Sequence, residues 1–216
     1  MLLTKYGHAC VRITDGDRRL AIDPGSFSEV AIALEDLDAV LITHEHGDHV
    51  DHDALAAAAT ANQNLHIWAP TAVTTQFASS AALEGRYTPV GPGETFDAGG
   101  LQVRTFGGQH ALIHSSVPVV ANVAYLIADV IYHPGDSYVV PTARPELALV
   151  PINAPWAKLA ETVDFAVSVR APHAVGIHDA LLSEIGRGGY GGHVARVGAE
   201  YGCQYHPLTP GESFEL

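Results

Sequence analysis

Cysteine and long apolar runs are both scarce in this chain of 216 residues. Its two cysteines, Cys10 and Cys203, are too few for the disulfide framework of a small secreted domain. No apolar stretch approaches the ~20 residues that a membrane-spanning helix needs. The first six residues also lack the charged start and apolar core of a signal peptide. The sequence therefore predicts a reduced, cytoplasmic protein that does not enter a membrane.

Positive charge is also in short supply, with 11 Lys and Arg against 24 Asp and Glu and a net charge of -13. Such a surface repels phosphates, which excludes a general nucleic-acid binder. Charged residues make up 16 % and hydrophobic residues 47 %, the composition of a folded chain. The length fits one domain, residues 1–216, with a substantial core. A small-molecule substrate is the expected partner, and a homo-oligomer is compatible with this composition.

Histidine is plentiful, with 13 in the chain, and four potential metal ligands crowd into residues 43–49. They are His44, His46, Asp48 and His49. The apolar run before them, residues 37–42, predicts a buried strand. Side chains two apart on an extended segment point the same way, and Gly47 allows the chain to turn back. Imidazole and carboxylate bind zinc and similar ions, and four ligands in two directions suit two ions better than one.

A third imidazole follows another predicted strand. Residues 101–106 alternate as a strand and lead through Gly107 and Gly108 to His110. Alone, this position is weak evidence, but taken with the first motif His110 is the expected third histidine ligand, and His114, four residues on, is its rival.

The pattern His-x-His-x-Asp-His after a strand resembles the signature of the metallo-β-lactamase superfamily. This resemblance implies an α/β chain folded as a four-layer αββα sandwich and a metal-dependent hydrolase. Two further segments, around His8 and Asp23, resemble the openings of the ascorbate-6-phosphate-lactonase-like branch. There the aspartate lies behind the metal ligands, so Asp23 and His8 are expected to support ligands by hydrogen bonds. The alternatives are a turn former for Asp23 and a core histidine for His8.

The resemblance also supplies the remaining ligands. Gly135-Asp136, after a strand over residues 130–133, is similar to the family's bridging aspartate, although the same pattern also suits an ordinary turn. His178, at the end of a strand over residues 174–178, is similar to the last ligand motif. Two ions are thus expected, held by His44, His46 and His110 and by Asp48, His49 and His178, with Asp136 as the bridge.

Such a centre implies a metal-bridging hydroxide that hydrolyses a small-molecule ester, lactone or phosphoester, with Asp48 and Asp136 as the catalytic carboxylates. Five imidazoles and two carboxylates suit zinc best, and manganese or iron fits the same donors. The alternative is a metal-binding or regulatory protein that kept the fold without catalysis. Turnover on a substrate panel separates the two.

The glycine-dense segment 186–193 predicts a mobile loop. Arg187, Tyr190 and His193 are candidates to reach a substrate from it, and a plain flexible connection is the alternative. Helices are expected over residues 29–36, 54–61, 70–83, 157–170 and 194–201. A β-meander followed by helices occurs twice, which predicts two similar halves packed sheet on sheet.

Overall fold

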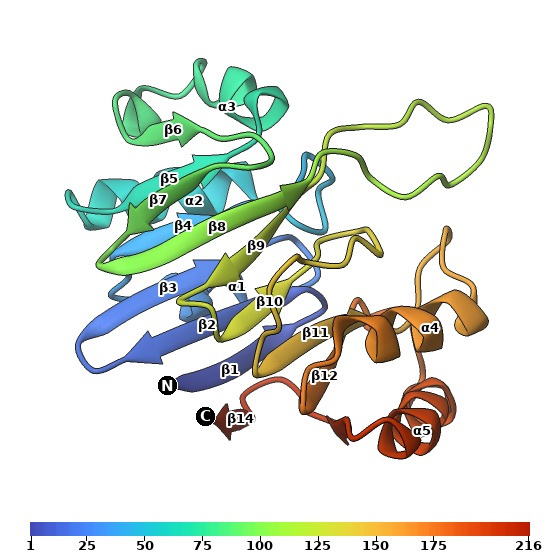
Figure 1. Ribbon diagram of the computed structural model, residues 1–216. Helices are drawn as coiled ribbons and strands as arrows, with labels where there is room; N and C mark the ends of the chain where they lie inside the picture. Colours follow the sequence, from blue (N-terminus) through green and yellow to red (C-terminus); the bar gives the residue numbers. More distant parts are fainter.

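The computed structural model describes residues 1–216, and its strands form two seven-stranded sheets (Figure 1). The first sheet has the order β14-β1-β2-β3-β4-β5-β6. Its strands are β1 (Leu2–Gly7), β2 (Cys10–Asp15), β3 (Arg18–Ile22), β4 (Ala39–Leu41), β5 (His66–Ala69), β6 (Tyr87–Pro89) and β14 (Ser213–Glu215). The first three pair antiparallel, and β3 to β6 pair parallel.

The second sheet repeats this plan, in the order β13-β12-β11-β10-β9-β8-β7. Its strands are β7 (Thr95–Ala98), β8 (Leu101–Gly107), β9 (Val123–Ile127), β10 (Ile131–His133), β11 (Leu147–Pro151), β12 (His173–Ile177) and β13 (Gln204–His206). An antiparallel meander runs from β7 to β10, and the strands from β10 to β13 pair parallel. The two halves are therefore similar, as the sequence predicts.

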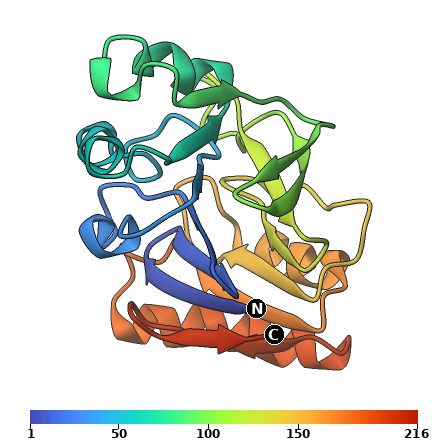
Figure 2. The ribbon, with the colours of Figure 1, turned by 90° about the vertical axis from the view of Figure 1, so that its left-hand side faces the viewer.

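Helices cover the outer face of each sheet, which gives four layers (Figure 2). They are α1 (Val30–Ala33), α2 (His52–Ala61), α3 (Thr71–Phe77), the 3₁₀ turn η1 (Ala81–Leu83), α4 (Leu159–Val169) and α5 (Glu184–Glu200). One apolar cluster fills the space between the sheets, where Leu41 and Leu149 are fully buried. Two further clusters join each sheet to its own helices. The αββα sandwich is confirmed, and no helix is long and apolar enough to span a bilayer.

The strands that precede the candidate site residues run toward one edge of the sandwich. Within the first sheet β1, β3 and β4 run in the same direction, and within the second sheet β8, β10 and β12 do so. Turns that follow the carboxyl ends of such strands gather at one edge, where α/β proteins bind their ligands. Every residue singled out as a metal ligand lies in one of these turns.

The prediction of a mobile loop at residues 186–193 is wrong, because this segment forms the first half of α5. The side chain of Ser183 caps the helix by accepting a hydrogen bond from the Gly186 N–H. Gly191 is required by packing, since a β-carbon there would lie 2.9 Å from the Tyr205 ring. The last helix thus begins ten residues before the predicted start, Val194, and Gly191 serves close approach rather than mobility.

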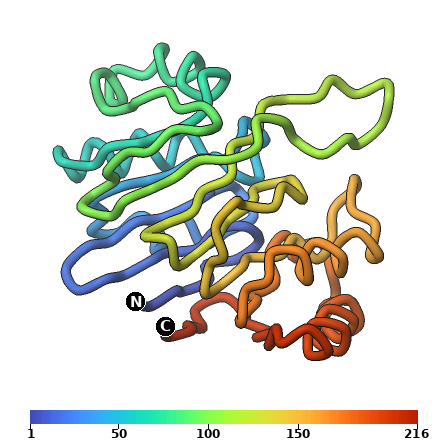
Figure 3. Tube along the Cα trace, in the orientation of Figure 1, coloured from blue at the N-terminus to red at the C-terminus, as the bar shows by residue number.

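Two short strands escape the sequence pattern, and one predicted strand is shorter than expected. β7 is one of the strands. The other, β14, crosses from the second half of the chain to pair with β1 in the first sheet, so the two termini meet (Figure 3). The strand expected over residues 119–128 begins only at Val123. Residues 108–122 before it form a long loop that extends from the body of the protein (Figure 3).

Candidate metal centre

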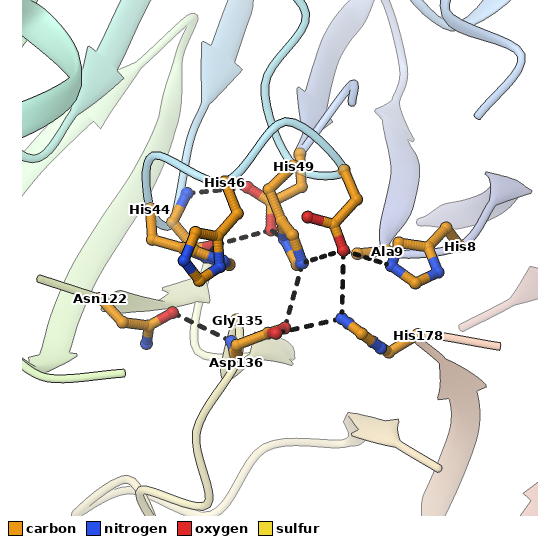
Figure 4. Close-up of polar contacts among 12 residues, drawn as sticks. His8, Ala9, His44, His46, His49, Asn122, Gly135, Asp136 and His178 are labelled. Atoms are coloured by element: carbon orange, nitrogen blue, oxygen red, sulfur yellow. Dashed lines mark hydrogen bonds and ion pairs between the residues drawn. The ribbon is translucent and has the colours of Figure 1, made fainter. Parts of the chain in front are cut away.

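Two groups of donors meet at the edge described above (Figure 4). In each group the candidate ligand atoms lie within 4.8 Å of one another. The first group is His44, His46, His110 and Asp136, and the second is His8, Asp48, His49 and His178. The structure therefore brings together all seven residues that the sequence singles out as ligands, together with His8. Their roles as ligands stay predictions.

Asp136 lies between the two groups, in the turn after β10. Its Oδ1 is 3.1 Å from His49 Nε2. Its Oδ2 is 3.3 Å from His110 Nε2 and 3.0 Å from His178 Nε2. One carboxylate thus faces imidazoles from both groups, the arrangement that a bridging ligand requires.

Four buried atoms of this cluster have no hydrogen-bond partner, and all four point into the centre. They are Nε2 of His49, His110 and His178, and Oδ1 of Asp136. Buried polar atoms in folded proteins are nearly always paired. Imidazole nitrogen and carboxylate oxygen are donors that divalent ions accept, so the residues fit a pair of metal ions.

The opposite ring nitrogen of each of these three histidines is held by the protein. His49 Nδ1 donates to Asp23 Oδ2 at 2.7 Å. His110 Nδ1 donates to the Ala111 carbonyl and His178 Nδ1 to the Asn153 carbonyl, both at 2.6 Å. Such partners fix the tautomer and orient each ring with Nε2 toward the ion.

The loop after β3 lies directly beneath the ligand turn. Gly25 packs so closely there that a β-carbon would lie 2.1 Å from the carbonyl of Asp48, so only glycine fits. Asp23, two residues earlier, is fully buried and also accepts hydrogen bonds from the N–H and Oγ1 of Thr43, both at 2.7 Å. Asp23 therefore occupies the supporting place that the resemblance implies, and it is more than a turn former.

Replacing Asp23 with alanine should weaken metal binding by ~10–100-fold, because the His49 ring loses the acceptor that orients it. Titration of the metal-free variant with zinc, followed by calorimetry, measures this loss. Asp51→Ala is a matched control, since Asp51 caps α2 nearby by accepting from the Ala54 N–H without touching a ligand ring. Equal affinity in the wild type and Asp23→Ala would return Asp23 to a role in the turn alone.

His8 holds Asp48 rather than standing as a free donor. Its Nδ1 accepts a hydrogen bond from the Ala180 N–H at 3.3 Å, so its Nε2 carries the proton. That Nε2 donates to Asp48 Oδ2 at 3.0 Å. The tautomer thus favours the supporting role expected from the sequence, although His8 lies close enough to be counted with the second group.

Charges in the cluster are balanced in a way that suits cations. Burial lowers the pKa of His44 well below its ordinary value, so this ring is neutral. Burial acts in the same direction on His178, but Asp136 and Asp48 overcome it and raise its pKa to about 9. Burial is likewise overcome at His49, where Asp136 and Asp23 raise the pKa well above its ordinary value. Without ions, protons on these two rings therefore offset the carboxylates, and cations would replace them.

Sequence reasoning missed two residues that hold Asp136. The indole Nε1 of Trp156 donates to Asp136 Oδ2 at 2.9 Å, and the Asp136 N–H donates to Asn122 Oδ1 at 3.0 Å. Trp156 follows β11, and Asn122 precedes β9. The sequence offered one indication for Trp156, which is that it follows a strand, β11, that ends at the same edge of the sandwich.

Four other candidates are not members of the two donor groups. His114 is exposed and bonded to Ser116, so His110 and not its rival enters the first group. Arg187 lies on α5, where its guanidinium donates to the Leu182 carbonyl. Tyr190 packs against the apolar cluster between α5 and the second sheet, and His193 is exposed on the same helix. Because the segment is helical, no mobile loop carries these three side chains, and their contact with a substrate stays a prediction.

Comparison with known proteins agrees with this geometry. A family model described as a β-lactamase superfamily domain matches residues 2–178. Protein Rv0786c of Mycobacterium tuberculosis is 35 % identical over 202 residues, which cover 91 % of this chain and 92 % of that protein. A UPF0173 metal-dependent hydrolase of Methylobacterium nodulans is 29 % identical over 206 residues, 81 % of this chain and 83 % of its own.

A solved structure shares the fold along the whole chain. Igni18, a metallo hydrolase of the archaeon Ignicoccus hospitalis, has a TM-score of 0.74 at 18 % identity, with 100 % of this chain and 98 % of that one covered. The family match spans the turns that carry His44 through His178. These matches identify the superfamily and do not single out its ascorbate-6-phosphate-lactonase-like branch. The chain belongs to the metallo-β-lactamase superfamily.

Proposed function

We propose that this metal-dependent hydrolase holds two divalent ions in its two donor groups and cleaves the ester or lactone bond of an uncharged small molecule. The observation that carries the proposal is the buried convergence of the donors with four unpaired atoms aimed at the centre. Asp136, which faces both groups, is the proposed bridge. Zinc suits this set of imidazoles and carboxylates best, and manganese or iron suits the same donors.

When bound, two such ions supply an acidified water and stabilise the negative charge that develops on the substrate. The protein must then orient the attacking water. Asp48 is the more open of the two carboxylates, with 22 % of its side chain exposed against 3 % for Asp136. His8 holds Asp48 Oδ2, which leaves Oδ1 to accept a hydrogen bond from the water and its proton. No other acid lies in place to protonate the leaving group, so good leaving groups are favoured.

Exposed apolar side chains close in sequence to the candidate ligands support an uncharged substrate. Leu112 is 60 % exposed two residues after His110, and Leu181 is 64 % exposed three residues after His178. Phe27 is 47 % exposed, with its ring 5.3 Å from that of His8. Exposed apolar groups that gather beside a site commonly contact its ligand.

Cations that would recognise a phosphate are not free at the centre. Lys5, the lysine on β1, is buried and paired with Asp179. Arg187 donates to the Leu182 carbonyl and is not a member of either donor group. A phosphoester therefore lacks the counter-charge that phosphate sites provide, and a carboxylic ester or lactone is preferred.

A panel of substrates tests this choice. With zinc or manganese restored, apolar esters and lactones should be hydrolysed at least ~10-fold faster, by kcat/KM, than phosphomonoesters and phosphodiesters with the same leaving group. Leu112→Ser should reduce kcat/KM for the apolar esters. Ile32→Ser makes the same kind of change at an exposed residue on α1 and should leave kcat/KM unchanged. Faster cleavage of the phosphoesters would reverse the assignment.

The non-catalytic alternative makes a different prediction. A metal-binding or regulatory protein would take up both ions and turn over none of the panel. The complete donor set favours catalysis, because each of the seven predicted ligands belongs to one of the two groups whose donor atoms lie within 4.8 Å of one another.

A further inference from the structure

The first strand carries a buried ion pair that the proposed reaction does not use. Lys5 on β1 is 1 % exposed, and its Nζ donates to Asp179 Oδ2 at 2.7 Å. The same Nζ donates to the Gly176 carbonyl at 2.8 Å. A buried ion pair is often no more stabilising than a well-packed apolar pair, so stability alone does not account for it.

Both acceptors of Lys5 flank one candidate ligand. Gly176 lies two residues before His178, and Asp179 lies directly after it. His178 itself has φ +59°, in the left-handed region that residues with a β-carbon avoid. This turn directs His178 Nε2 to within 3.0 Å of Asp136 Oδ2. Such a conformation persists where the surroundings hold it.

His8, three residues after Lys5, completes the hold on this turn. Its carbonyl accepts from the His178 N–H at 3.0 Å, and its Nδ1 accepts from the Ala180 N–H at 3.3 Å. Residues 176 to 180 are thus tied to β1 and the turn after it, which belong to the opposite sheet of the sandwich.

We propose that Lys5 is a positioning residue, which joins Gly176 to Asp179 and so holds the His178 turn in the geometry that the second ion needs. This inference rests on the proposed two-ion function. The ordinary alternative is a tie between the sheets that serves stability only. The two differ in what they predict for the separate ions, because the first group, around His44 and His110, has no contact with Lys5.

Stepwise calorimetric titration of the metal-free protein with zinc tests the proposal. Lys5→Met should weaken binding of the ion held by the second donor group by ~10–100-fold. The affinity for the ion held by the first donor group should stay within ~3-fold of the wild type. Lys158→Met is the matched control, since Lys158 is the other lysine of the chain and lies exposed before α4, and both affinities should stay unchanged. Equal second-ion affinity in Lys5→Met and the wild type would overturn the proposal.

A double variant separates positioning from stability. Lys5→Met combined with Asp179→Leu replaces the ion pair by apolar groups and should restore the melting temperature. Binding of the second ion should stay weak in this double variant, because no hydrogen bonds then join position 179 to Gly176. If the melting temperature and the affinity for the second ion recover together, the Lys5–Asp179 pair serves stability only. If Lys5→Met fails to fold, Asp179→Asn keeps the shape and an acceptor and undergoes the same titration.

Failure of the proposed function is distinguishable in the same experiment. A wild type that binds only one ion overturns the two-ion centre, and the role of Lys5 with it. A wild type that binds two ions, with an unchanged second step in the variants, overturns the role of Lys5 alone.

Discussion

Replacing Asp136 with asparagine should remove most of the hydrolytic activity and at least one of the two ions. The Asp136 carboxylate faces His49 on one side and His110 and His178 on the other. Its charge offsets the repulsion between two cations held close together. Loss of a supporting partner alone costs ~10–100-fold in affinity or activity, so loss of the shared ligand should cost more than ~100-fold in kcat/KM. Metal analysis and steady-state kinetics measure both effects.

Asp129→Asn is the matched control for this change. Asp129 precedes β10, at the opposite end from Asp136, and pairs with Arg104 at 2.8 Å. It should keep both ions and full activity. His133 is a poorer control, because it is fully buried and accepts a hydrogen bond from the Gly135 N–H at 3.1 Å, so its loss disturbs the same turn. An Asp136→Asn protein that keeps two ions would place the bridge on another residue.

Removal of the two ions should abolish activity and lower the melting temperature by about 20 °C, with roughly half of that shift due to each ion. Purified without chelator, the protein should carry close to two divalent ions per chain. An ion present at ~1,000 times its Kd stabilises the folded state by about 4 kcal/mol, and 1 kcal/mol corresponds to ~2–4 °C in a chain of this size. Calorimetric melting with and without chelator gives the shift. Readdition of zinc or manganese should restore both properties.

The same ions should bind more tightly as the pH rises. In the metal-free protein Asp136 and Asp48 hold the pKa of His178 at about 9, and Asp136 and Asp23 hold that of His49 well above its ordinary value. Protons on these rings compete with cations, so apparent affinity should increase through neutral pH to about pH 9, and binding should release protons. Calorimetry in two buffers of different ionisation enthalpy counts them. A protein that binds no ion at any pH would contradict the metal-dependent function.

Local sequence was enough to indicate the first four donors. His44, His46, Asp48 and His49 lie within six residues, and a strand followed by a glycine turn brings them together with little help from the rest of the chain. The αββα fold was implied by the family that this turn resembles, and the two similar halves were predictable because each half reads as a meander followed by helices. These features depend on spacing along the chain, which the sequence states directly.

His110, Asp136 and His178 were predictable only as strand ends. Whether three strand ends meet is decided by strand order and direction, and here β8, β10 and β12 all point to the same edge. The residues that support the ligands by hydrogen bonds were even harder to predict from the sequence. Trp156 is 20 residues from Asp136 and Lys5 is 174 from Asp179, and no spacing rule links such pairs.

The glycine-rich start of α5 shows that a local sequence pattern can also predict the wrong structure. Taken by itself, glycine predicts flexibility, because it gains the most conformational entropy when unfolded. In the folded protein a β-carbon at Gly191 would lie only 2.9 Å from the Tyr205 ring, so glycine is needed there for packing. Burial of α5 against the second sheet outweighs the low helix propensity of its glycines. The sequence by itself therefore determined the ligand turn and the order of strands and helices in the two halves, which arise from local periodicity, and the family resemblance of the turn implied the layered fold. The tertiary structure decided which distant residues complete and support the centre, because those contacts exist only after the two sheets have packed.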